Sequence, residues 1–398
     1  MRESRLATAS TIWVQGGLAV FVAMLLASCA GPAAGPALHD TPSTVLLPAG
    51  KAGVTDGRGR FREIYCAIRH DHGGALPNDR PCQDSAALWR LPDEPPATGR
   101  PVRLGQSRAG LMVVMVPGLL AECIAGLSTV FEDARANLEA QGYRTGYIQT
   151  RGRQNAETNA EILRDALSAM PTGLRIVLVT HSKGTVDAMA ALVAYPELSA
   201  RVVAVVSVAG AVNGSPLADI VPQALAELAE STTLADCPPG SGVEAVDSLR
   251  RSARLAWLAA HDLPRGVRTY SLAAFAGPDD MSAALLPFYR ILAQVEPRND
   301  GLVIASDAVI PGSTLLGHPN ADHLAVAMPF AANTPVLAAT MMTRNDYPRA
   351  VLLEAALRYV EEDLSSAPVP TVGVDLPTIV EVGRSVRTAV CCDLPSRY

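Results

Sequence analysis

The sequence predicts an α/β protein with a mostly parallel central sheet, helices on both faces of the sheet and a helical cap insertion. Short runs that are apolar throughout alternate along the chain with amphipathic stretches of helical period. Strands that are apolar on both faces and alternate with helices are typical of a parallel sheet covered on both sides. A lone hydroxyl side chain, Ser182, lies where one of these apolar runs ends and a helical pattern begins.

The composition fits one large domain with appendages. The chain has 398 residues, 49% of them hydrophobic, which is enough to bury a large core. The formal net charge is −6, and the sequence contains no basic run or basic–aromatic stripe. We therefore expect no nucleic-acid partner.

Residues 1–28 have the features of an export signal. Arg2 and Arg5 precede an apolar stretch, and "LASC" ends at Cys29. This ending resembles a bacterial lipobox, which predicts cleavage before Cys29 and lipid attachment to its thiol. An ordinary signal peptide and an uncleaved anchor are the alternatives, although the apolar stretch is short for a membrane span. By resemblance to enterobacterial sorting, Ala30 after the cysteine predicts the outer membrane of a bacterial cell envelope.

Two segments precede the regular pattern, and one follows it. Residues 29–60 are rich in Ala, Pro and Gly and are predicted to form a flexible tether. Residues 61–105 hold Cys66 and Cys82 among many turn-forming residues and are predicted to form an irregular N-terminal arm. Residues 106–365 are expected to form the α/β domain. Residues 366–398 are broken by prolines and are predicted to form a C-terminal arm.

The strands and helices of the domain follow one another in a regular order. Strands are expected at "LMVVMV", "TGYIQ", "RIVLVT", "RVVAVVSVAG" and "LVIAS". Helices are expected at "STVFEDARANLEAQ", "NAETNAEILRDALSA" and "KGTVDAMAALVAY", and another is expected to begin at "LAVAMPF".

Ser182 lies where a buried strand ends and a helix begins, in Thr180-His181-Ser182-Lys183-Gly184. A sharp turn there presents a side chain at the carboxyl edge of the sheet, in front of a helix N-terminus. The usual nucleophile motif at such a turn is G-x-S-x-G, and Thr180 departs from it. A helix N-cap is the alternative role for Ser182.

The stretch Val116 to Leu120, "VPGLL", follows the first strong strand. At a turn of this kind, one oxyanion-binding amide comes from the loop after that strand, and the other comes from the residue after the nucleophile. The candidate donors are the backbone amides of Leu119 and Lys183. Alternatively, Gly118 only permits a tight turn.

From Gly110 to Leu364 the chain resembles the α/β-hydrolase superfamily, and within it the bacterial lipase-like esterases. The resemblance is carried by "VPGLL", "THSKG", "AGAVNGSPLAD", "NDGLV" and "NADHLAVAMPF". It implies that Asp300 is the acid and His323 the base of a Ser-His-Asp triad. The chain order Ser182, Asp300, His323 is the one expected of this fold. Asp307 and His318 are the alternatives for the acid and the base.

The segment at about 217–266 has two helical runs and falls between strands on the side where lids lie, so we expect it to form the cap. Its apolar faces are suited either to an acyl chain or to ordinary helix packing. Structural disulfides are expected in an exported chain, and no Cys/His spacing typical of a metal site occurs. One candidate pair is Cys123 with Cys237. In the alternative, Cys123 is free and Cys237 pairs with Cys391 or Cys392.

The resemblance implies a serine hydrolase that cleaves carboxylic esters through an acyl-enzyme, with no cofactor and no metal. An acyltransferase that uses the same triad is one alternative, because only water access and acceptor binding distinguish the two. A non-catalytic envelope lipoprotein that kept the fold for binding is the other. The expected partners are an ester substrate and a membrane that holds the N-terminal lipid.

Replacement of the cysteine at the end of the export signal tests the predicted anchor. In Cys29→Ala the thiol that would carry the lipid is absent, so we expect no lipid attachment and accumulation of a precursor or a soluble form. Metabolic labelling with palmitate measures the difference. Equal palmitate incorporation into wild type and Cys29→Ala would exclude Cys29 as the lipidated residue.

Overall fold

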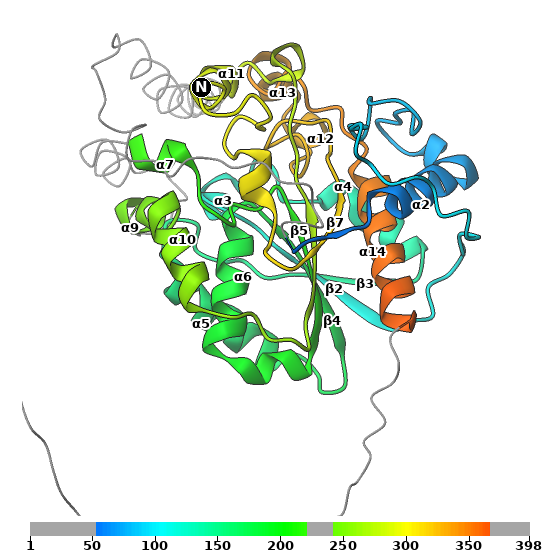
Figure 1. Ribbon diagram of the computed structural model, residues 1–398, viewed down its shortest axis with the longest axis horizontal. Helices are drawn as coiled ribbons and strands as arrows, with labels where there is room; N and C mark the ends of the chain where they lie inside the picture. The colour runs from blue at the N-terminus through cyan, green and yellow to red at the C-terminus, as the bar shows by residue number, and fades with distance from the viewer. Residues whose placement is uncertain (1–52, 221–241, 367–398) are drawn as a thin grey trace, which may run out of the picture.

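A computed structural model describes residues 53–220 and 242–366. A sheet of seven strands lies at its centre, with helices packed around it (Figure 1). The strand order is β1-β7-β6-β5-β4-β2-β3, and all neighbouring strands are parallel. This confirms the predicted α/β-hydrolase fold class. The strands are β1 (Thr55–Asp56), β2 (Leu111–Val116), β3 (Arg144–Tyr147), β4 (Arg175–His181), β5 (Val202–Val208), β6 (Arg268–Leu272) and β7 (Thr314–Gly317).

Helices cover both faces of the sheet (Figure 1). One layer contains α2 (Arg58–Asp71), α4 (Glu132–Ala140) and α14 (Arg349–Ser366), and the other contains α5 (Ala156–Ala169), α6 (Lys183–Ala194) and α10 (Arg251–Ala260). Each layer encloses its own apolar core against the sheet. The shorter helices are α3 (Ala121–Ile124), α7 (Pro216–Ile220), α9 (Gly242–Asp247), α11 (Leu286–Leu292), α12 (Phe330–Asn333) and α13 (Pro335–Thr340).

The order of the strands determines where a ligand can bind. After β2 the chain moves outward to the edge strand β3, and it then returns to form β4 on the other side of β2. The connections that leave β2 and β4 therefore diverge, and in open α/β sheets ligands bind at such a point, outside the carboxyl ends of the strands. Ser182 directly follows β4 and Leu119 lies just after β2, so both candidate residues lie at this point of the sheet edge.

The N-terminal part of the structure is more regular than the sequence predicted. Thr55 and Asp56, expected in the tether, form β1 and pair with β7. Residues 58–71, expected partly in the tether and partly in an irregular arm, form α2, which packs against α14. Its apolar side chains, including Phe61, Ile64 and Ile68, are fully buried. The prediction failed because many turn residues downstream obscured the helical spacing of these three.

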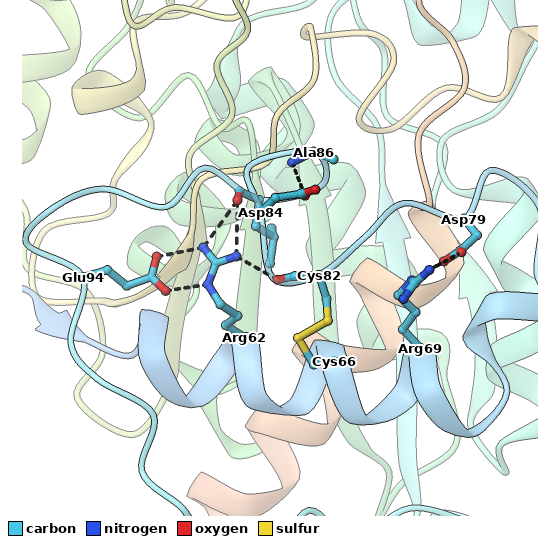
Figure 2. The surroundings of a disulfide bond; sticks show 9 residues. Arg62, Cys66, Arg69, Asp79, Cys82, Asp84, Ala86 and Glu94 are labelled. Carbon is cyan, nitrogen blue, oxygen red and sulfur yellow. Dashed lines mark hydrogen bonds and ion pairs between the residues drawn. A yellow bond between two sulfur atoms is a disulfide. The ribbon is translucent and has the colours of Figure 1, made fainter.

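The irregular stretch after α2 is fastened to that helix. Figure 2 shows the disulfide between Cys66 on α2 and Cys82 in the stretch. Beside it, the Arg62 guanidinium donates to the Glu94 carboxylate at 2.5 and 2.8 Å and to the Cys82 carbonyl at 3.1 Å (Figure 2). These contacts hold an otherwise loop-like segment against the body.

Two expectations near the end of the domain were wrong. The stretch "LVIAS" forms a tight turn and a 3₁₀-helix at Ala305–Ala308 in place of a strand. The residues after His323 form turns, and the next helix begins only at Phe330. Short apolar runs do not by themselves distinguish a strand or a helix from a buried turn.

Several predicted segments lie outside the described residues. These are the signal at 1–28, most of the tether, the cap residues 221–241 and all but the first residue of the C-terminal arm. Within the ranges that are described, no helix combines the length and the apolar character needed to cross a membrane.

The Cys66–Cys82 bridge closes a short loop, and its removal should lower thermal stability. A sequence separation of 16 corresponds to about 3 kcal/mol of unfolding free energy in the loop-closure account. For the double variant Cys66→Ala/Cys82→Ala we expect Tm to fall by about 5–10 °C. Thermal unfolding followed by circular dichroism measures this. An unchanged Tm would show that the arm is held by its polar contacts alone.

Candidate active site

Ser182 lies on a strained turn between β4 and α6. Its backbone has φ 56° and ψ −129°, a region that non-glycine residues rarely adopt. The turn is held from the neighbouring strand, because the Ser182 amide donates to the Val208 carbonyl at 3.3 Å. The Ser182 carbonyl accepts from the amides of Thr185 and Ala211 at 3.1 and 3.2 Å. The Ser182 side chain forms no N-cap hydrogen bond, so the alternative N-cap role is not observed.

Two glycines bring the loop after β2 into direct contact with this turn. A Cβ atom on Gly118 would lie 2.7 Å from the Ser182 Cβ and 3.1 Å from its Oγ. A Cβ atom on Gly184 would lie 2.7 Å from the Val116 carbonyl oxygen and would overlap that of Pro117. Both positions therefore require glycine, and Gly118 does more than permit a turn.

The candidate oxyanion donors lie beside these contacts. Leu119 follows Gly118 in the loop, and Lys183 is the first residue of α6. Leu120, next in the loop, has φ 58° and precedes the short helix α3. The helix N-terminus adds a favourable field for negative charge at the same place.

Thr180 occupies the position where the motif usually has glycine. Its side chain is fully buried, and its hydroxyl lies 2.8 Å from that of Thr185, which lies 3.0 Å from that of Ser207. A Cβ atom on Gly210 would overlap the Ser207 hydroxyl. The protein therefore accommodates Thr180 by bonding its hydroxyl in a buried cluster, with Gly210 leaving the necessary room.

Asp300 and His323 meet in the fold although 23 positions separate them. The His323 Nδ1 lies 2.7 Å from Asp300 Oδ2, and the His323 amide donates to the Asp300 carbonyl at 2.8 Å. Asp300 Oδ1 accepts from the amides of Leu302 and Val303 at 2.9 and 2.7 Å. Both side chains are buried. The carboxylate is thus fixed by its own turn and aimed at the imidazole ring.

The segment that leads to His323 is braced by the N-terminal arm. The Trp89 amide donates to the His318 carbonyl at 2.8 Å, and the Asn320 amide donates to the Ala87 carbonyl at 2.9 Å. Just after this segment, Asp322 accepts from the amides of Leu324 and Ala325. The turn that carries His323 is therefore held before this residue by the arm and after it by the Asp322 side chain.

His181, directly before Ser182, contacts His323 in a way the sequence did not indicate. Its Nε2 lies 2.9 Å from the His323 carbonyl oxygen, and the two rings are 4.7 Å apart. Burial, together with the nearby His323, holds the pKa of His181 well below its ordinary value. A neutral His181 can donate to the carbonyl without adding a positive charge beside the candidate base. No motif could have signalled this, because the contact depends on how two distant loops meet.

The alternative acid and base have other partners. Asp307 pairs with Arg251 of α10 at 3.0 Å, and burial raises the pKa of Asp307 to about 6. His318 Nδ1 lies 3.0 Å from the Ala273 carbonyl oxygen, and burial lowers the pKa of His318 to about 4. Of the two aspartates, Asp300 is the one that contacts the candidate base, His323.

The described residues of the predicted cap, 217–220 and 242–266, lie beside polar contacts to the rest of the domain. Besides the Arg251–Asp307 pair, the Ser215 amide donates to the Leu249 carbonyl at 2.9 Å. Trp257 and Leu258 of α10 pack on the apolar core, which agrees with the alternative of ordinary helix packing.

Cys123 is a disulfide cysteine, which removes the free-thiol alternative. Its predicted partner, Cys237, lies outside the described residues.

In residues 53–220 and 242–366, no three His, Cys, Asp or Glu side chains are grouped so as to hold a metal ion.

No protein-family model and no curated protein matches the chain. Among solved structures, a metagenomic carboxyl esterase is 56% identical, with a TM-score of 0.79; the match covers 83% of this chain and 99% of the esterase. The chain belongs to the carboxyl esterases of the α/β-hydrolase fold.

Other solved structures share a lower sequence identity with this chain. A Bacillus licheniformis lipase in its mature form is 22% identical, with a TM-score of 0.44; the match covers 61% of this chain and 93% of the lipase. The Legionella pneumophila phospholipase PlaB is 17% identical, with a TM-score of 0.36; the match covers 50% of this chain and 45% of PlaB.

The close approach at Gly118 predicts a sensitive position. In Gly118→Ala the added methyl would displace either the loop after β2 or the Ser182 side chain. We expect kcat for ester hydrolysis to fall about 10²-fold, as displacements near 1 Å do at reacting centres.

Gly126 supplies the matched control, because a Cβ atom there meets nothing within 4 Å. Steady-state kinetics on a p-nitrophenyl ester should show Gly126→Ala close to wild type. Equal kcat values for the two variants would contradict the importance of the Gly118 contact.

Proposed function

We propose that this esterase hydrolyses carboxylic esters through an acyl-enzyme formed on Ser182, with His323 as base and Asp300 as acid. The main support is the 2.7 Å contact between His323 and Asp300 in the same fold that presents Ser182 on a strained turn. The 56% identity to a carboxyl esterase supports the reaction class.

In the first half of the reaction, His323 Nε2 takes the proton of the Ser182 hydroxyl as the oxygen attacks the ester carbonyl. The tetrahedral oxyanion accepts hydrogen bonds from the amides of Leu119 and Lys183, which stabilise charge that develops only in the transition state. His323 then gives the proton to the departing alcohol, and an acyl group remains on Ser182.

In the second half, His323 takes a proton from water, and the resulting hydroxide equivalent attacks the acyl-enzyme carbonyl. The carboxylic acid leaves as Ser182 regains its proton. Asp300 stays ionised and orients the ring through Nδ1, so the imidazolium formed in each half is stabilised. The amides of Leu302 and Val303 hold the other carboxylate oxygen, which keeps Asp300 in the required rotamer.

The location of the enzyme is a further part of this proposal. Export, cleavage before Cys29 and lipid attachment would hold the domain at the bacterial envelope, most simply at the outer membrane. The support is the sequence at the N-terminus, with its charged start, apolar core and "LASC" ending. A lipid anchor would place the site near ester substrates at the membrane surface.

Substitution of the three proposed residues tests the chemistry. Ser182→Ala should abolish p-nitrophenyl ester hydrolysis and labelling by a fluorophosphonate probe, because the attacking oxygen is absent. His323→Ala should lose about 10³-fold or more in kcat, and Asp300→Asn should lose less, because the ring remains in place.

Circular dichroism should show that all three variants are folded. Wild-type activity in Ser182→Ala would refute the mechanism. Loss of activity in His318→Ala combined with full activity in His323→Ala would move the base to His318.

A further inference from the structure

The residue that follows the proposed nucleophile carries a fully buried charge. The Lys183 ammonium lies 2.6 Å from Asp187 Oδ1, one turn further along α6, and the two side chains are 0% and 1% exposed. Lysine is almost never buried completely without a partner, and burial of such a pair costs desolvation energy. The proposed mechanism uses the Lys183 amide but neither of these side chains, so the pair needs another explanation.

The side chain of Asn159 connects this ion pair to the neighbouring helix α5. Asp187 Oδ2 accepts from Asn159 Nδ2 of α5 at 2.9 Å. The same Asn159 side chain bonds both backbone groups of Arg151, each at 2.9 Å, accepting from its amide and donating to its carbonyl. Asn159 is fully buried. It therefore connects the start of α6 to the loop after β3.

That loop lies against the loop of the second proposed oxyanion donor. The amides of Gly152 and Arg153 donate to the Glu122 carboxylate at 2.7 and 3.2 Å. A Cβ atom on Gly152 would lie 2.9 Å from the Leu120 Cα and would overlap the Leu120 amide nitrogen. Leu120 has a positive φ, which surrounding contacts must maintain. Leu119 is its direct neighbour.

The charge on Lys183 explains why the connection can work at neutral pH. Burial raises the pKa of Asp187 to about 6, and Lys183 is the main group that opposes this rise, followed by Asn159 and Arg254 of α10. An ionised carboxylate offers both oxygens as acceptors. Asp187 can therefore accept from Lys183 and Asn159 together.

We propose that the Asp187–Asn159 link is a positioning device that holds the loop carrying Leu119 at a set distance from the Lys183 amide. The link rests on the proposed function, because it positions the two amides assigned there to the oxyanion. Asp187 and Asn159 act through the backbone of residues 151–153 and touch no substrate, so they are positioning residues. Their loss should weaken transition-state binding more than substrate binding.

Two sets of variants test the link. Asn159→Leu removes the connection at similar side-chain size. Lys183→Met/Asp187→Leu removes both charges and the acceptor, whereas Lys183→Met/Asp187→Asn removes the charges but keeps an acceptor for Asn159. We expect the first two to lower kcat about tenfold or more with KM within about twofold, and the third to recover most of the loss.

The affinity of a trifluoromethyl ketone, whose adduct carries an oxyanion, should fall by the same factor as kcat. Hydrogen exchange should become faster at residues 118–122 in Asn159→Leu and in the Asp187→Leu double variant. The matched control is Glu362→Gln, which weakens the ion pair between Arg60 of α2 and Glu362 of α14. It should lower Tm while kcat and exchange at 118–122 stay unchanged.

Unchanged exchange at 118–122 in Asn159→Leu would overturn the link, whatever the activity. So would equal kcat for the two double variants, or an equal loss of kcat in Glu362→Gln. The proposed function fails on a different result, which is ester hydrolysis by Ser182→Ala at the wild-type rate. The two proposals are therefore judged by separate measurements.

Discussion

The strained turn at Ser182 is the constraint on which the rest of the site depends. Its backbone, at φ 56° and ψ −129°, is stable only because surrounding groups hold it. Val208 accepts from its amide, Ala211 donates to its carbonyl, and the loop after β2 presses against it at Gly118. Each of these contacts comes from an element that flanks β4 in the sheet. The turn is therefore a product of the parallel sheet and its central strand.

Buried polar groups connect the loops around this turn. Asp300 is held by its own turn and holds His323, while His181, next to Ser182, holds the carbonyl of His323. Arg251 and Asp307 attach α10 in a similar way. A buried charged or polar group tolerates few alternative positions, because a lost partner leaves it unsatisfied. Such contacts give a loop-built site the rigidity that its backbone alone does not supply.

The N-terminal segment contributes more to the site than its irregular appearance suggests. α2 fills one helical layer, and the disulfide joins it to the stretch that follows. That stretch reaches the turn before His323, where Trp89 and Ala87 bond backbone groups of residues 318 and 320. The candidate base is thus braced by a segment more than 200 positions earlier in the chain. Loss of this brace would disturb a site to which the arm contributes no catalytic group.

The sequence alone determined the fold class and the candidate triad residues. Apolar runs alternating with helical periods require a parallel sheet covered on both faces, and Ser182 sits at a strand-to-helix junction that such a sheet places at its carboxyl edge. The resemblance to bacterial esterases then implied Asp300 and His323. These features are local patterns of residues, and they remain readable without knowing how distant segments meet.

The tertiary structure decided what depends on contacts between distant segments. It shows that Asp300 contacts His323, whereas Asp307 faces Arg251 and His318 faces a backbone carbonyl. The glycine requirement at position 118 likewise arises between loops, as does the role of Asn159. The i, i+4 spacing of Lys183 and Asp187 allowed a helical pair, but spacing does not reveal burial. Burial is set by all surrounding elements at once, which is why it had to come from the structure.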